Sequence, residues 1–281
     1  MRTQAASRPA VRLTPLMVRV LSGLLLLAAV VGLILLGRWG IWAIVVTLSG
    51  LALWEFRRLS DRMGFRAPSW LLFPLAAYFA FSGTLLRAVP LQLVLALALI
   101  GGLSVFLFIP GRREGLGRWA MGLAGAIYIG LPMNYYLLLY SQAGGGRGLS
   151  WLLLTIITAV VSDAGAMLVG QRLGRHPFFT AISPKKTVEG AAAGILLCAP
   201  VMLVGGLLFL GLQPWQAILL GLLVGISAEI GDLVESQMKR LAGVKDSSHL
   251  IPGHGGVLDR LDSLLFPPIV VYLFSYYLHV L

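Results

Sequence analysis

The sequence predicts an all-α integral membrane protein that crosses the bilayer about nine times, with its N-terminus in the cytoplasm. Charged residues make up only 12% of the 281-residue chain, whereas a soluble domain has about a quarter, and the mean hydropathy is +0.88. Nine apolar segments follow one another along the chain, and basic residues fall almost entirely in alternate connections between them. Together these observations predict a polytopic helical membrane protein.

Each apolar segment is long enough to cross a hydrocarbon core of about 30 Å, which takes about 17–25 helical residues. In chain order the segments are residues 20–37, 39–56, 70–86, 89–109, 119–140, 149–171, 188–212, 214–235 and 264–281. The glycine-rich residues 144–148 separate the fifth segment from the sixth and are interpreted as a flexible connector.

Basic residues indicate the orientation. Of the 22 Lys and Arg residues, 19 fall in the N-terminal tail or in the even-numbered loops, and only Arg38, Arg87 and Arg147 fall on the other side. The positive-inside rule therefore places the N-terminus and the even loops in the cytoplasm. This placement explains the net charge of +11 without nucleic-acid binding. The single cysteine, Cys198, excludes an internal disulfide and a multi-cysteine zinc site.

Acidic residues divide the chain into two parts. Only Glu55, Asp61 and Glu114 fall in the first 150 positions, whereas eight of the eleven acids fall in the remainder. We therefore expect an N-terminal transmembrane scaffold with about five segments and a C-terminal catalytic domain with about four. The predicted boundaries are 1–148 and 149–281, with cytoplasmic loops at 171–188 and 235–263.

Three of the acids that fall inside apolar segments are candidate site residues. Asp163 precedes the end of its segment by eight residues, which is about 12 Å along a helix, and an ionisable group at that depth is a candidate functional residue. Glu229 and Asp232 are spaced to share one helix face, which continues toward the cytoplasm through Ser236, Lys239 and Arg240. Such a face could bind a divalent cation with its phosphate ligand, or it could be an ion-pair ladder.

The block Ser183-Pro184-Lys185-Lys186 precedes the seventh segment. Serine is a favourable N-cap and proline a favourable first helical residue, so the helix is expected to begin here. Lysines at a helix N-terminus oppose the helix dipole, which favours a bound anion at this place. Ordinary enrichment of cytoplasmic loops in basic residues explains them equally well.

The last cytoplasmic loop holds the densest set of ionisable residues. Asp259 and Asp262 flank Arg260, and carboxylate oxygens together with substrate phosphates are the usual ligands of magnesium. His254 lies among glycines and could act as a base, a phosphate donor or a structural imidazole, and histidine ligation of the metal is disfavoured. The sequence contains no P-loop, no G-x-S-x-G elbow and no HExxH. The residues thus predict a cytoplasm-facing, magnesium-dependent site for a phosphorylated ligand.

The run S-x-M-K-R-x4-K-D-x-S-x2-I-P-x-H-G-G-V-x-D-R-L-D, from Ser236 to Asp262, resembles the signature of the phosphatidate cytidylyltransferases, or CDP-diacylglycerol synthases. Two further blocks agree with that family, at residues 162–170 and 183–190. The resemblance covers about residues 160–265, and the N-terminal half carries no motif.

The resemblance implies a reaction in which CTP and phosphatidate give CDP-diacylglycerol and pyrophosphate. It also implies Mg2+, with a second cation left open, an all-helical multi-span fold and a homodimer. We therefore expect a multi-pass protein of the cell (inner) membrane, with its active site facing the cytoplasm and no nucleic-acid partner. Phosphatidate would reach the site from the leaflet.

The resemblance also suggests roles for individual residues. The expected metal ligands are Asp232, Asp246 and Asp259, followed by Asp163 and Asp262. The expected catalytic residues are Asp232, Lys239, Arg240, Lys245, Asp246, His254, Asp259 and Arg260. The expected substrate-binding residues are Ser183, Lys185, Lys186, Ser236, Gly255 and Gly256, the last two because their backbone N–H groups could reach a phosphate.

Two alternative functions differ from cytidylyl transfer in the chemistry they require. A CTP-dependent membrane lipid kinase, acting on polyprenol or phytol, would transfer the γ-phosphate and release CDP. A transporter of an anionic solute would need polar residues along a pore through both halves, whereas here they cluster at the cytoplasmic ends of the later segments. The long signature favours cytidylyl transfer.

Overall fold

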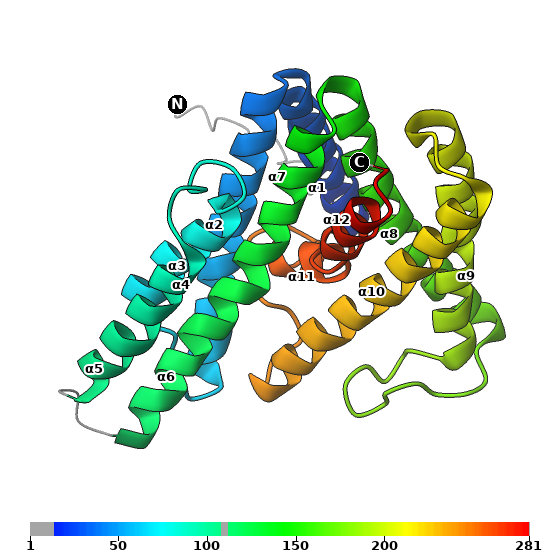
Figure 1. The fold of residues 1–281 in the computed structure, drawn as a ribbon. Helices are drawn as coiled ribbons and strands as arrows, with labels where there is room; N and C mark the ends of the chain where they lie inside the picture. Colours follow the sequence, from blue (N-terminus) through cyan, green and yellow to red (C-terminus); the bar gives the residue numbers. More distant parts are fainter. Residues whose placement is uncertain (1–13, 108–111, 281) are drawn as a thin grey trace, which may run out of the picture.

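The computed structural model describes residues 14–107 and 112–280, and this part of the chain is helical, with two isolated β-bridges and no strand (Figure 1). The α-helices are α1 (Pro15–Leu35), α2 (Arg38–Arg62), α3 (Ser69–Phe81), α4 (Leu91–Ala96), α5 (Gly102–Leu107), α6 (Arg112–Gly125), α7 (Leu131–Gln142), α8 (Gly145–Leu173), α9 (Val188–Gly205), α10 (Pro214–Leu241), α11 (Leu258–Leu261) and α12 (Pro267–Tyr277). Three π-helical turns, η1 (Leu97–Gly101), η2 (Ala126–Gly130) and η3 (Gly206–Leu210), extend neighbouring helices, and a 3-10 turn, η4 (Asp262–Leu264), follows α11.

The all-helical prediction is confirmed. Among the described residues, six helices are long and apolar enough to cross a membrane: Leu16–Leu35, Arg38–Arg62, Glu114–Gln142, Gly146–Leu173, Val188–Leu210 and Pro214–Leu241. Two shorter apolar helices cover Ser69–Phe81 and Leu91–Val105, and α12 has 11 residues. Several apolar helices are thus typical of a multi-pass membrane protein, while the count of nine and the cytoplasmic N-terminus stay predictions.

Capping residues explain where the main helices begin. Pro15 and Pro214 stand in the first turns of α1 and α10, where a missing N–H costs nothing. The Thr14 hydroxyl accepts a hydrogen bond from the Met17 N–H, and Gln213 forms a reciprocal capping box with Gln216. These caps satisfy backbone donors that a helix end would otherwise leave unpaired.

The predicted start of the seventh segment at residue 188 is confirmed, but the expectation that Ser183 caps this helix is wrong. Helix α9 begins at Val188, and the Thr187 hydroxyl caps it by accepting the Gly190 N–H. The residues before it pair with an earlier part of the chain instead, because Phe178 donates to the Lys186 carbonyl and a β-bridge joins Pro177 to Thr187. A backbone pairing within residues 176–188 therefore overrides the local Ser-Pro signal.

Two apolar cores hold the helices together. One is shared by α8, α9, α10 and α12 and includes Trp151, Met202 and Leu220, all almost fully buried. The other lies among α2, α3 and α7, and it also contains Leu258 and Leu261 of α11. The loop that carries the long motif is thus anchored by apolar residues in the N-terminal half of the chain.

Close helix packing brings the motif-bearing segments together. A Cβ atom on Gly194 of α9 would lie 2.7 Å from the Ser162 carbonyl oxygen of α8, and one on Gly221 of α10 would lie 2.6 Å from the Cys198 carbonyl oxygen of α9. Glycine at these positions lets the three helices approach closely. As a result, the C-terminal end of α10 and the loop between α8 and α9 lie at the same end of the molecule (Figure 1).

Candidate functional site

A cavity of about 350 Å³ opens between α8, α9, α10 and the loop before α9. We call it the acidic cavity, because its polar lining includes Asp163, Glu229 and Asp232, together with Ser183, Lys185 and Lys186. Three separate blocks of the sequence therefore meet at one place.

Lys186 neutralises two of these acids. Its Nζ lies 2.6 Å from Glu229 Oε2 and 2.8 Å from Asp232 Oδ2. Burial lowers the pKa of Lys186, but the charges of Asp232 and Glu229 outweigh burial and raise it above its ordinary value. Lys186 is therefore a charged ammonium group between two carboxylates.

A further acid, Asp262 of η4, adds to the negative charge of the same region. The Ser263 hydroxyl donates to Asp163 Oδ2 at 2.5 Å and ties η4 to α8, and the Ser236 hydroxyl donates to Asp232 Oδ1 at 3.2 Å. Burial, together with the charges of Asp232 and Asp163, raises the pKa of Asp262 to about 7. Asp163, Asp232 and Asp262 thus have too little positive charge nearby to balance them. A divalent cation would supply that charge.

The predicted metal ligands do not all lie together. Asp163, Asp232 and Asp262 lie close enough to influence one another electrostatically, whereas Asp246 and Asp259 have other surroundings. Within residues 14–107 and 112–280, no group of three or more metal-ligating side chains has its atoms arranged to hold an ion. Carboxylate oxygens are the kind of ligand that magnesium prefers, so the donor set fits this ion by its chemistry.

Asp259 is the centre of a buried hydrogen-bond network. Its Oδ1 accepts from Lys239 Nζ at 2.8 Å, and its Oδ2 accepts from the Ser247 N–H and hydroxyl, both at 2.9 Å, and from the Gly256 N–H at 2.8 Å. Burial raises the pKa of Asp259, but these donors together lower it below its ordinary value. Lys239 also pairs with Glu235 one turn earlier on α10. Asp259 therefore organises the loop that follows α10.

The two glycines of the motif have different requirements. Gly255 has φ +85°, a conformation that favours glycine. A Cβ atom on Gly256 would lie 2.0 Å from the Ser247 hydroxyl oxygen and 2.6 Å from Glu55 Oε1. The Gly256 N–H donates to Asp259, and its predicted contact with a phosphate stays a prediction. Glycine is needed at position 256 for space.

A second cavity, of about 680 Å³, lies beside this loop. We call it the basic cavity, and its lining includes Arg19, Lys245, Asp246, His249, His254, Gly255 and Arg260. The structure thus brings five of the predicted site residues together here, around more basic than acidic groups. His254 Nδ1 lies 3.0 Å from the Ser22 hydroxyl, so helix α1 contacts the imidazole.

Arg240 connects the two regions. Its Nε donates to the Ile182 carbonyl at 3.0 Å and its Nη1 to the Val244 carbonyl at 3.4 Å. One side chain thereby fixes the loop beside the acidic cavity relative to the loop beside the basic cavity. In this arrangement Arg240 acts on the two loops, and its predicted contact with substrate stays a prediction.

Glu55, which lies against the motif, is a residue that the sequence patterns did not single out. This fully buried carboxylate of α2 accepts hydrogen bonds from the N–H groups of Val257 and Leu258 at 2.9 and 2.6 Å and from the hydroxyls of Ser247 and Ser248 at 3.0 and 2.5 Å. An acid inside an apolar segment is a signal that could have identified Glu55. Its partners, about 200 positions later, could not be deduced from spacing.

A known protein family matches most of this chain in sequence. A family model described as "Cytidylyltransferase family" matches residues 17–278. Curated relatives named phosphatidate cytidylyltransferase include proteins of Mycobacterium bovis, 40% identical over 129 residues, Staphylococcus haemolyticus, 37% over 149, and Helicobacter pylori, 43% over 136. These matches cover 46, 52 and 48% of this chain and 41, 55 and 50% of the respective relatives. The chain thus spans about half the length of the curated relatives it matches.

Proposed function

Because the chain belongs to the cytidylyltransferase family, we propose that it transfers the cytidylyl group of CTP to phosphatidate. A phosphatidate oxygen attacks the α-phosphorus of CTP, a new P–O bond forms, and the bond to the departing pyrophosphate breaks. The products are CDP-diacylglycerol, a phospholipid precursor, and pyrophosphate. The relatives named above, which carry this activity in their names, support the proposal.

The observation that carries the proposal is the juxtaposition of an acidic and a basic cavity at one end of the helices. The Lys239–Asp259 ion pair lies in the segment that connects them, and Arg240 joins their loops. Two anionic reactants have to be neutralised and held in line for such a transfer, and most of the catalysis consists of this positioning. Cations at one cavity and carboxylates for a metal ion at the other suit that task.

Magnesium is the cofactor we propose, held by Asp163, Asp232 and Asp262, with Glu229 adjacent and a second cation left open. When bound there, the ion would neutralise phosphate charge beside the carboxylates. Lys186 is already paired with two carboxylates, so it balances the acidic cavity and directs their oxygens.

The basic cavity would bind phosphate groups. Lys245 and Arg260 line it, and the described part of the chain shows no acidic partner for either side chain. Their charges are therefore free to stabilise the negative charge that gathers on the departing pyrophosphate. His254, held at Ser22, would donate a hydrogen bond to a phosphate oxygen in the same cavity.

The proposed setting is the cell inner membrane, crossed nine times, with the N-terminus and both cavities on the cytoplasmic side. The six long apolar helices and the cytoplasmic bias of basic residues support this placement. We also propose the division into parts 1–148 and 149–281 and a homodimer. Phosphatidate would enter from the leaflet between helices, because its acyl chains remain in the bilayer.

The proposal is tested with purified protein in detergent micelles. Pyrophosphate release should require CTP, phosphatidate and Mg2+ together and should stop when EDTA is added. Release of CDP in place of pyrophosphate would assign the chain to lipid phosphorylation, and absence of any lipid-dependent turnover would reject the transferase in favour of transport.

A further inference from the structure

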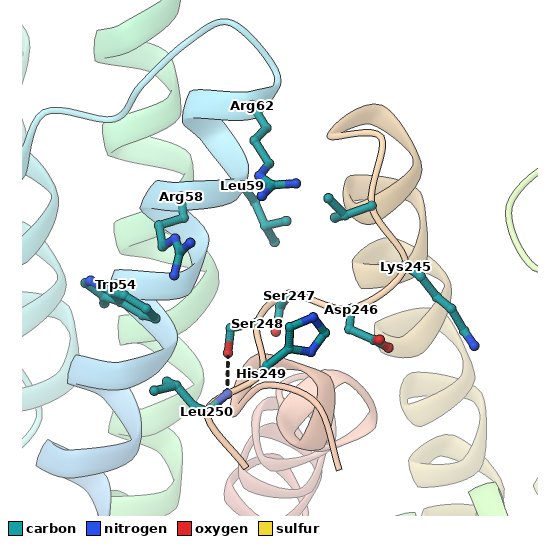
Figure 2. Close-up of a pocket in the computed structure, with 11 residues that line it drawn as sticks. Trp54, Arg58, Leu59, Arg62, Lys245, Asp246, Ser247, Ser248, His249 and Leu250 are labelled. Atoms are coloured by element: carbon teal, nitrogen blue, oxygen red, sulfur yellow. Dashed lines mark hydrogen bonds between the residues drawn. The ribbon is translucent and has the colours of Figure 1, made fainter. Parts of the chain in front are cut away.

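A third cavity, of about 480 Å³, lies between the cytoplasmic-end turns of α2 and the loop that follows α10. Figure 2 shows Arg58 and Arg62 extending from α2 on one side and Ser247, Ser248 and His249 on the other. We call it the arginine cavity. Its volume is within the range of about 300–1,000 Å³ that is typical of small-molecule sites.

The cations of this cavity have no acidic partner in the described part of the chain. Arg58 stacks over the Trp54 ring at 4.7 Å, which orients its guanidinium without neutralising it, and no ion pair involves Arg62 or Lys245. Asp246 is the only acid in the lining. Three basic side chains against one acid make the cavity suitable for an anion.

Arg58 and Arg62 differ from the other arginines nearby, because they line the cavity while those others bond within the protein. The usual excess of basic residues in a cytoplasmic loop would not explain that difference. Arg57 donates to the Ala67 carbonyl, and Arg66 lies 3.8 Å from Asp61, so both are used within the protein. Arg58 and Arg62 are one helical turn apart and therefore lie on the same face of α2. That face is the one that lines the cavity.

The two walls of the cavity are fixed relative to each other. Glu55, one turn before Arg58, accepts hydrogen bonds from the Ser247 and Ser248 hydroxyls in the opposite wall. The same helix thus supplies the two guanidinium groups and holds the loop that faces them. A binding site with fixed walls loses less entropy when its ligand binds.

The arginine cavity adjoins the basic cavity. Lys245, Asp246 and His249 line both, so a ligand in one lies beside a ligand in the other. A phosphate group is the anion whose geometry a pair of guanidinium groups matches best, because each can donate two parallel hydrogen bonds.

We propose that the arginine cavity binds a phosphate group, through Arg58 and Arg62, so that the N-terminal half contributes directly to reactant binding. The identity of the phosphate donor, the triphosphate of CTP or the headgroup of phosphatidate, rests on the proposed function. The affinity of the arginine cavity for phosphate does not depend on the proposed function.

The test compares Arg58→Gln/Arg62→Gln with wild type and with the matched control Arg66→Gln, which removes a charge nearby but outside the cavity. Dissociation constants are measured for CTP, for phosphatidate in mixed micelles against diacylglycerol, and for inorganic pyrophosphate. Loss of two charge-assisted contacts should weaken binding of at least one phosphate probe by about tenfold to a hundredfold. Single Arg→Lys variants provide a milder change if the double variant is poorly folded.

Weaker CTP binding identifies the nucleotide as the ligand, and weaker phosphatidate binding identifies the lipid. Affinities within twofold of wild type for all three probes would overturn the inference, as would an equal loss in Arg66→Gln. If wild type makes no CDP-lipid, the proposed function fails, yet the pyrophosphate comparison still decides whether the cavity binds phosphate.

Discussion

Replacing Glu55 should disrupt the loop that carries the catalytic motif, although Glu55 lies in the other half of the chain. Its carboxylate accepts hydrogen bonds from the N–H groups of Val257 and Leu258 and from the Ser248 hydroxyl, and it shares the single hydroxyl proton of Ser247 with Asp259. In Glu55→Ala, the two buried N–H groups lose their acceptor, at about 1–3 kcal/mol each. The hydroxyls can rotate toward other acceptors, so we expect a total loss on the order of 3–5 kcal/mol.

The conservative variant separates positioning from stability. Glu55→Gln keeps one acceptor oxygen but turns an NH2 group toward a donor, so its stability should fall by about half as much. A loop displaced by about 1 Å can still lower turnover about a hundredfold. We therefore expect Glu55→Gln to reduce kcat far more than it changes KM for CTP.

The assay combines thermal unfolding in detergent with steady-state pyrophosphate release. Glu114→Ala is the matched control, because Glu114 forms an exposed i,i+4 pair with Arg118 that contributes no more than about 1 kcal/mol. If Glu55→Ala retained wild-type thermal stability and turnover within twofold, the role assigned to Glu55 would be refuted.

Three further predictions concern the site itself. Asp246→Asn and Asp259→Asn should each abolish turnover while folded protein is still recovered, and near-normal activity in either would remove that residue from the proposed site. Lys239→Met leaves the buried carboxylates of Glu235 and Asp259 without their cation, so the melting temperature should fall by an amount equivalent to about 3–5 kcal/mol, measured by thermal unfolding. Burial and neighbouring carboxylates raise the pKa of Asp262 to about 7 from an ordinary value of 3.8, so its contribution to stability is present at acid pH and is lost as the pH rises through about 7. Thermal scans in EDTA should therefore show lower stability at pH 8 than at pH 5, with Mg2+ restoring it at pH 8, and a flat profile would contradict the proposed crowding of acids.

Local patterns predicted the helices well, because the apolar length of a segment is read directly from the chain. They failed at α9, where the Ser183-Pro184 signal was overridden by the backbone pairing of Phe178 with Lys186. This pairing makes a turn of the residues that the Ser-Pro signal would have placed in a helix.

The candidate site was predicted as a set of residues but not as a geometry. Spacing along α10 correctly placed Glu229 and Asp232 on one face, and both meet Lys186. The division of the predicted metal ligands between two regions was not predicted, because it depends on the path of the loop after α10. Glu55 was missed for the same reason, since its partners lie in that loop.

The most direct test of the central claim follows two labels on CTP through one turnover. With purified protein, phosphatidate and Mg2+, the account predicts that label at the α-phosphate enters the lipid fraction while label at the γ-phosphate leaves as pyrophosphate. Label from the γ-phosphate in the lipid, with CDP released, would contradict cytidylyl transfer and identify a lipid kinase instead.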